Sequence, residues 1–261
     1  MGAGSAGYGW RVFGIGLIAM ALVWLVWGDF SPGQEVPAGF VNRSVAAYIV
    51  ASLTLIAGVA LESRKTAAWA AAAVAIYYTL VIVIVMDGPG LVANLTEYGS
   101  YSNEAEQLAI AASALIIFAA FANIDVAVAA RLRRVGQMIF GVCAVLFGGA
   151  HFFYMNLTVP LVPQWLPPSA HFWAYATGIG HIAAGLAILT GVQGRLAAIL
   201  LTGMYASFTF LVHIPIVVAD PSNYYGWTEN ALNLALVGAA WVVADSLAPL
   251  RLSPAASVAR I

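Results

Sequence analysis

The stretch AAWAAAAVAIYYTLVIVIVM, residues 67–86, contains no charged side chain and is long enough to cross a bilayer. An α-helix rises ~1.5 Å per residue, so about 20 apolar residues span a hydrocarbon core of roughly 30 Å. The run is continuously apolar, whereas a β-barrel strand would alternate apolar and polar positions over about ten residues. This stretch therefore predicts a transmembrane helix.

Similar runs lie on both sides of this stretch. They cover about 10–28, 45–62, 105–124, 136–155, 170–190, 195–218 and 229–247. The whole chain of 261 residues is 62% hydrophobic and 8% charged, with a mean hydropathy of +0.91. That composition excludes a soluble domain of this size. We therefore predict an all-α, polytopic membrane protein with eight transmembrane helices in a lipid bilayer. The net charge of −1 predicts no nucleic-acid partner.

The basic residues predict the orientation, because cytoplasmic loops of membrane proteins carry an excess of Lys and Arg. With the amino terminus in the cytoplasm, only Arg43 of the ten basic residues lies outside. The cytoplasmic ones are Arg11, Arg64, Lys65, Arg131, Arg133, Arg134, Arg195, Arg251 and Arg260. This distribution predicts two cytoplasmic termini and a multi-pass protein of the inner (cytoplasmic) membrane.

An internal repeat predicts the domain organisation. The pair Ala47-Tyr48 matches Ala174-Tyr175, and the segment 105–110 matches 231–236 at nearly the same offset. We expect a first four-helix repeat over 1–130 and a second over 131–261. Each repeat has four spans, an even number, so both enter the membrane in the same direction and are parallel repeats.

All four histidines fall in the second repeat. In the predicted topology His151, His171 and His213 lie near the outer ends of their spans, and His181 lies near the midplane. Glu229 begins the last span on the same side. Because intramembrane ionisable groups usually face a bundle interior and mark function, we expect a His-lined pocket opening to the periplasm or exterior. The first repeat would act as its scaffold.

Three segments of the second repeat carry a family resemblance. They are FGGAHFFYMNL (147–157), TGIGHIAAGLAILTG (177–191) and FLVHIPIVVADP (210–221). Residues 134–247 thereby resemble the DoxX-like membrane proteins, which are related to the small subunit of thiosulfate:quinone oxidoreductase. The resemblance implies quinone-coupled electron transfer beside a partner oxidoreductase subunit or within a homo-oligomer. The chain departs from that family's single four-helix unit because it is duplicated.

The first hypothesis is a quinone-interacting subunit of an oxidoreductase. Its proton-exchanging residues would be His151, His181 and His213, because imidazole transfers protons near neutral pH. Glu229 would conduct protons outward. The quinone ring would bind among Tyr154, Trp173, Tyr205, Trp227 and Asn230. The lone Cys143 excludes a dithiol relay within the chain.

Two alternatives come from other classes of protein. In a haem- or transition-metal-binding protein, His151 and His213 would be ligands, with His171 or Glu229 completing the site. A small-solute transporter, or a non-catalytic assembly subunit, would also fit a membrane protein with repeats and a polar midplane residue.

Overall fold

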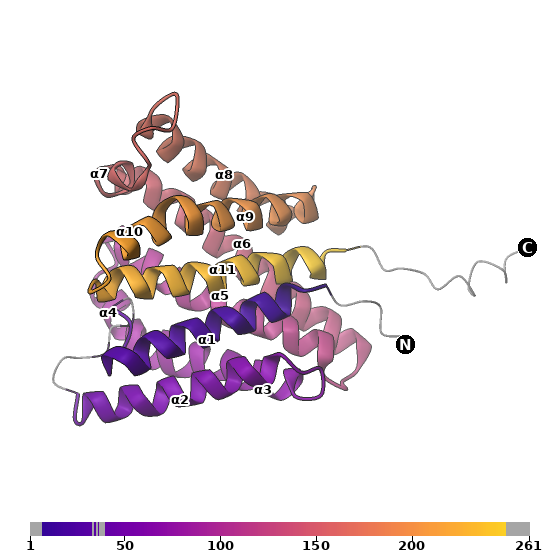
Figure 1. Cartoon of the computed structure of the whole chain (residues 1–261). Helices are drawn as coiled ribbons and strands as arrows, with labels where there is room; N and C mark the ends of the chain where they lie inside the picture. Colours follow the sequence, from indigo (N-terminus) through magenta and orange to yellow (C-terminus); the bar gives the residue numbers. More distant parts are fainter. Residues whose placement is uncertain (1–6, 33, 35, 37–39, 249–261) are drawn as a thin grey trace, which may run out of the picture.

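Helices make up the core of the computed structural model, which describes residues 7–32, 34, 36 and 40–248 (Figure 1). No strand occurs in this described part of the chain. The helices are α1 (Gly9–Trp27), α2 (Arg43–Leu61), α3 (Ala67–Ile76), η1 (Tyr77–Asp87), α4 (Gly88–Ala93), α5 (Tyr98–Phe121), α6 (Val126–Phe153), α7 (Met155–Thr158), η2 (Val159–Leu161), α8 (Ala170–Thr190), α9 (Gly194–Phe208), η3 (Thr209–His213), α10 (Ile214–Ala219) and α11 (Tyr224–Ser246). Segments η1 and η3 are π-helical and run directly into α4 and α10.

Within the described residues, 7 helical segments are long and apolar enough to cross a membrane. They are α1, α2, the continuous segment Ala67–Ala93, α5, α6, α8 and the continuous segment Gly194–Ala219. The fold is therefore that of a multi-pass helical membrane protein. Helix α11 has 23 residues but is more polar, since it carries Glu229, Asn230 and Asn233. It packs on α1, α5 and α9 and buries most of its length, so it needs fewer apolar side chains facing outward.

Several helices begin earlier than hydropathy predicts. Helices α5, α6 and α11 start at Tyr98, Val126 and Tyr224, ahead of the apolar runs expected from 105, 136 and 229. The residues before the expected runs include polar or charged side chains but are still helical, as in α6, which passes through Arg131, Arg133 and Arg134. Asp125 caps α6 because its carboxylate accepts hydrogen bonds from the N–H groups of Ala127 and Val128, at 2.9 and 3.1 Å. The expected boundary at 130/131 therefore lies inside α6, and residues 122–125 connect α5 to α6.

Helices from the two halves of the chain pack against each other. Helix α1 lies against α11, and α5 lies against α6, so the first and last described helices meet (Figure 1). The α1–α11 contact is close enough that a Cβ at Gly16 would overlap the backbone of Ala235. A Cβ at Gly238 would overlap the backbone of Phe13. Small residues permit this approach, as is usual between membrane helices.

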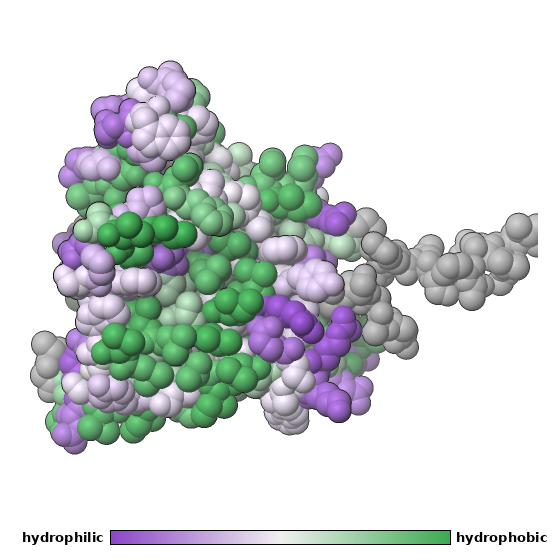
Figure 2. All heavy atoms as spheres, viewed as in Figure 1, coloured by the Kyte–Doolittle hydropathy of each residue, from purple (hydrophilic) through white to green (hydrophobic). Residues whose placement is uncertain are grey.

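The two ends of the bundle differ in charge. One end carries α4, α7 and α10, and we call it the short-helix end (Figure 1). At the opposite end lie Arg11, Arg64, Lys65, Arg131, Arg133, Arg134 and Arg195. Arg251 and Arg260 lie outside the described residues. Arg43, at the short-helix end, pairs with Asp29 at 2.7 Å. Figure 2 shows hydrophobic side chains over the middle of one face, with hydrophilic ones toward its ends.

Candidate functional site

Two histidines from neighbouring helices meet at the centre of the candidate site. Helix α6 provides His151 and α8 provides His181, and their ring centroids are 5.1 Å apart. Thr177 lies one turn before His181 on the same face of α8. Its hydroxyl oxygen is 3.2 Å from Nδ1 of His151. We call these three residues the His–Thr–His cluster.

The hydrogen bonds of the cluster define which ring nitrogens carry protons. Nδ1 of His181 lies 2.8 Å from the carbonyl oxygen of Thr177, which can only accept, so Nδ1 carries the hydrogen. The hydroxyl of Thr177 donates to the carbonyl of Trp173 at 2.8 Å. It therefore accepts from Nδ1 of His151. In a neutral imidazole the other nitrogen is an acceptor, so both Nε2 atoms are available to accept a proton.

Aromatic side chains surround His181, which is 3% exposed. The centroid distances from its ring are 5.4 Å to Tyr205, 6.1 Å to Phe208 and 6.3 Å to Phe147. Tyr205 is also 3% exposed. Its hydroxyl is buried without a hydrogen-bond partner among the described residues. An unsatisfied buried hydroxyl costs about 1–3 kcal/mol, so this group needs an explanation.

The cluster is joined to α11 through the backbone of α9. The side-chain amide of Asn233, which is buried, donates to the carbonyl of Tyr205 at 3.0 Å and to the hydroxyl of Thr209 at 2.7 Å. Thr209 is the first residue of the π-helical segment η3. These bonds hold the register of α9 at the point where its backbone changes from α- to π-helical.

We expect Asn233→Leu to lower the free energy of unfolding by about 1–3 kcal/mol, because the Thr209 hydroxyl and Tyr205 carbonyl would lose a buried donor. Leucine keeps a similar side-chain volume, so packing changes little. Unfolding in a denaturing detergent, followed by circular dichroism, measures the effect. An unchanged midpoint would show that η3 does not depend on this amide.

Two carboxyl groups approach each other near the cluster. Glu229 of α11 interacts electrostatically with Glu106 of α5. Tyr225, one turn before Glu229, lies within the electrostatic range of both. Glu106 also interacts electrostatically with Tyr205. The expected scaffold half therefore contributes a carboxyl group to the site, and polar groups continue from His181 through Tyr205 to Glu106 and Glu229.

Three residues predicted to bind the quinone ring instead form hydrogen bonds from their side chains to backbone groups of the protein. The Trp173 indole donates to the carbonyl of Pro167 at 2.8 Å, and the Trp227 indole donates to that of Pro221 at 3.0 Å. The hydroxyl of Tyr154 accepts from the N–H of Gly99 at 2.7 Å. Their hydrogen bonds stabilise loops and helix ends at the short-helix end. Of the predicted aromatic set, Tyr205 is the one whose ring packs against the His–Thr–His cluster, whereas Trp173 contacts it only through its backbone carbonyl.

The other predicted residues are dispersed. His171 is exposed at the start of α8, and His213 is half-buried at the end of η3. Asn230 is half-buried beside Glu229. Over the described part of the chain, no three His, Cys, Asp or Glu side chains are grouped so as to hold a metal ion. His151, His213 and His171 thus do not form the predicted three-ligand set, and His151 pairs with His181 instead.

Sequence reasoning missed Thr177, Phe147, Phe208 and Glu106. Thr177 could have been found, because its spacing of four residues from His181 places both on one helix face. Glu106 gave no such signal, since its approach to Glu229 depends on how α5 packs against α11.

Comparison with known proteins adds one match. The model of a domain of unknown function (DUF8561) matches residues 140–244, which include the His–Thr–His cluster, Tyr205 and Glu229. This match gives the second half a family likeness but no assigned activity. Searches of curated proteins and of solved structures found no significant match.

Proposed function

We propose that the protein binds a lipid-soluble quinone beside His181 and exchanges protons with it, as the membrane subunit of a partner oxidoreductase. In this proposal the chain spans the inner membrane eight times as two parallel repeats, with both termini cytoplasmic. The resemblance of residues 134–247 to DoxX-like proteins supports the same class of function. The site would open toward the short-helix end, where the loops after α6 and α10 lie.

The observation that carries the proposal is the buried Tyr205 hydroxyl, which has no partner among the described residues. It lies in the aromatic group that surrounds an imidazole, with ring centroids 5.4 Å apart. A quinone is a flat ring with oxygens on opposite sides. Aromatic side chains favour a flat ring, and a hydroxyl and an imidazole are the polar groups that would orient its oxygens.

The hydrogen bonds of His181 support a direction for proton transfer. Because Nδ1 donates to the carbonyl of Thr177, Nε2 has a free lone pair and can accept a proton from a hydroxyl group. His151, 5.1 Å away, is held in the same tautomer by Thr177. Glu106 and Glu229 continue the polar groups beyond Tyr205. A proton accepted at His181 therefore has titratable groups on both sides.

Tyr205→Phe and His181→Phe test the ligand directly. Each keeps an aromatic ring in place and removes one polar group. We expect each variant to weaken the binding of decylubiquinone about tenfold, because the loss of about 1.4 kcal/mol from one hydrogen bond changes an equilibrium constant by that factor. Quenching of tryptophan fluorescence in detergent gives the dissociation constants.

Tyr175→Phe is the matched control, because Tyr175 lies on α8 but is exposed at 47%. This variant should bind decylubiquinone as the wild type does. If Tyr205→Phe and His181→Phe also retain wild-type affinity, quinone binding at this cluster is wrong. Thermal melting of all the variants separates a loss of binding from a loss of folding.

A further inference from the structure

A hollow lies in the first half of the molecule, between α2 and α3. This cavity of about 460 Å³ has the size of a small-molecule site. Its lining is almost wholly apolar and has no charged residue. The lining side chains are Val50, Leu53, Thr54, Ile56, Ala57, Ala60, Thr66, Trp69, Ala70, Ala73, Val74 and Tyr77. We call it the α2–α3 cavity.

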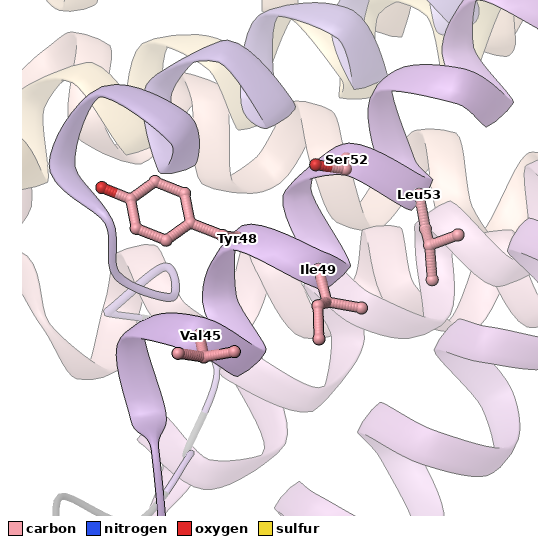
Figure 3. Close-up of a pocket in the computed structure, with 5 residues that line it drawn as sticks. All are labelled: Val45, Tyr48, Ile49, Ser52 and Leu53. Carbon is pink, nitrogen blue, oxygen red and sulfur yellow. The ribbon is translucent and has the colours of Figure 1, made fainter.

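The α2–α3 cavity opens sideways, between helices, onto the apolar surface. Trp69 and Ile56, which line it, are 81% and 63% exposed. Leu53 lines both this cavity and a shallower hollow on α2, formed with Val45, Tyr48, Ile49 and Ser52. Figure 3 shows Ile49 and Leu53 projecting from α2 on the same side. A ligand would therefore enter from the hydrocarbon region of the bilayer.

One unpaired hydroxyl lies in the lining of the α2–α3 cavity, and a second lies on the neighbouring residue. Tyr77 lines it, and its hydroxyl is buried without a hydrogen-bond partner among the described residues. Tyr78 is 1% exposed, and its hydroxyl is also buried without a hydrogen-bond partner among the described residues. The two rings pack edge to face with centroids 5.3 Å apart. Both residues begin the π-helical segment η1, and π-helical segments occur frequently at functional sites.

We propose that the α2–α3 cavity binds a neutral membrane lipid that has one oxygen function, a hydroxyl or carbonyl, at the end of an apolar body. The oxygen would pair with the Tyr77 hydroxyl, and the apolar body would lie along α2 and α3 toward the lateral opening. The lack of a charged lining residue argues for a neutral ligand. A phospholipid acyl chain is a poorer fit, because it ends in a methyl group that leaves the hydroxyl unpaired.

Photolabelling can test this proposal with the full-length protein in nanodiscs. The probes are a diazirine derivative of farnesol and a diazirine derivative of phosphatidylcholine, with crosslinks mapped by peptide mass spectrometry. We expect the farnesol probe to label α2 and α3 peptides saturably and to be displaced by unlabelled farnesol. Tyr77→Phe should require about tenfold more probe for half-maximal labelling, because one hydrogen bond is lost.

Ala73→Phe, which fills the cavity, should abolish saturable labelling of the same peptides. Tyr48→Phe is the control, because Tyr48 is an exposed α2 tyrosine outside the α2–α3 cavity, and it should behave as the wild type. Non-saturable labelling, or saturable labelling that neither Tyr77→Phe nor Ala73→Phe changes, would overturn the proposal. Equal labelling by the phosphatidylcholine probe would do so as well, since it would show an ordinary lipid contact. Thermal melting confirms that the compared variants are folded.

Discussion

Replacement of Gly238 by leucine is expected to abolish folded protein, the largest stability effect that the structure predicts. A side chain at this position of α11 would overlap the backbone N and Cα of Phe13 on α1. Backbone atoms cannot rotate away as the end of a flexible side chain can. Overpacking costs about 1–3 kcal/mol where side chains adjust, so we expect more than about 3 kcal/mol here. Size-exclusion chromatography of a fluorescent fusion measures the folded fraction.

Gly203→Leu provides the matched control for this result. Gly203 lies on α9 and is exposed, and a Cβ added there would point into open space, with no neighbouring side chain or helix within 4 Å. The same substitution there adds an apolar side chain without a clash and removes a flexible residue from a helix, so folding should be retained. If both variants lose the folded peak, the loss does not come from the close packing of α1 on α11. If neither variant loses it, that packing does not limit folding.

Seven of the eight predicted apolar runs correspond to helices long and apolar enough to cross a membrane, whereas the polar ends of helices were predicted less well. The run quoted from residues 67–86 forms the long segment Ala67–Ala93. In contrast, α6 begins at Val126, ahead of the run expected from 136. Hydropathy detects the apolar part of a helix, whereas α6 continues into polar surroundings because the Asp125 cap satisfies its first N–H groups.

The candidate site was predicted only partly, for a physical reason. The cost of placing histidine in a membrane pointed to all four histidines, and only the helix packing shows that His151 and His181 are the two that meet. The backbone around each aromatic residue decides which group its side chain contacts. Trp173 reaches the carbonyl of Pro167, whereas Tyr205 faces His181. The spacing of residues along the chain does not predict which of these aromatic side chains faces the histidine.

A comparison between the two halves links the proposed sites. The offset that relates Ala47-Tyr48 to Ala174-Tyr175 also relates Tyr78 to Tyr205. Both of these tyrosines are buried, and in both the hydroxyl lacks a partner among the described residues. The same offset relates Thr54 to His181. One half thus has an imidazole where the other has a hydroxyl, which fits proton exchange in the second half and neutral-ligand binding in the first.

Glu106→Gln and Glu229→Gln are expected to slow the protonation of bound quinone about 100-fold each, since a positioned acid or base contributes about 10²–10⁴-fold. The two carboxyl groups interact across α5 and α11, and glutamine preserves their shape without binding a proton. An electrode supplies the electrons to decylubiquinone bound to the purified protein, and an equal number of protons must then reach the ring. Infrared difference spectra follow the carboxyl C=O band and the rate together.

The double variant distinguishes one shared function from two separate ones. Groups that act as a unit are strongly non-additive, so the double variant should be about as slow as each single variant. A further loss of about 100-fold in the double variant would instead show that the two carboxyl groups contribute independently and do not act as a unit. Glu97→Gln removes an exposed carboxyl group at the same end of the bundle and should leave the rate unchanged. Equal slowing by Glu97→Gln would attribute the effect to surface charge and exclude the proposed role of Glu106 and Glu229.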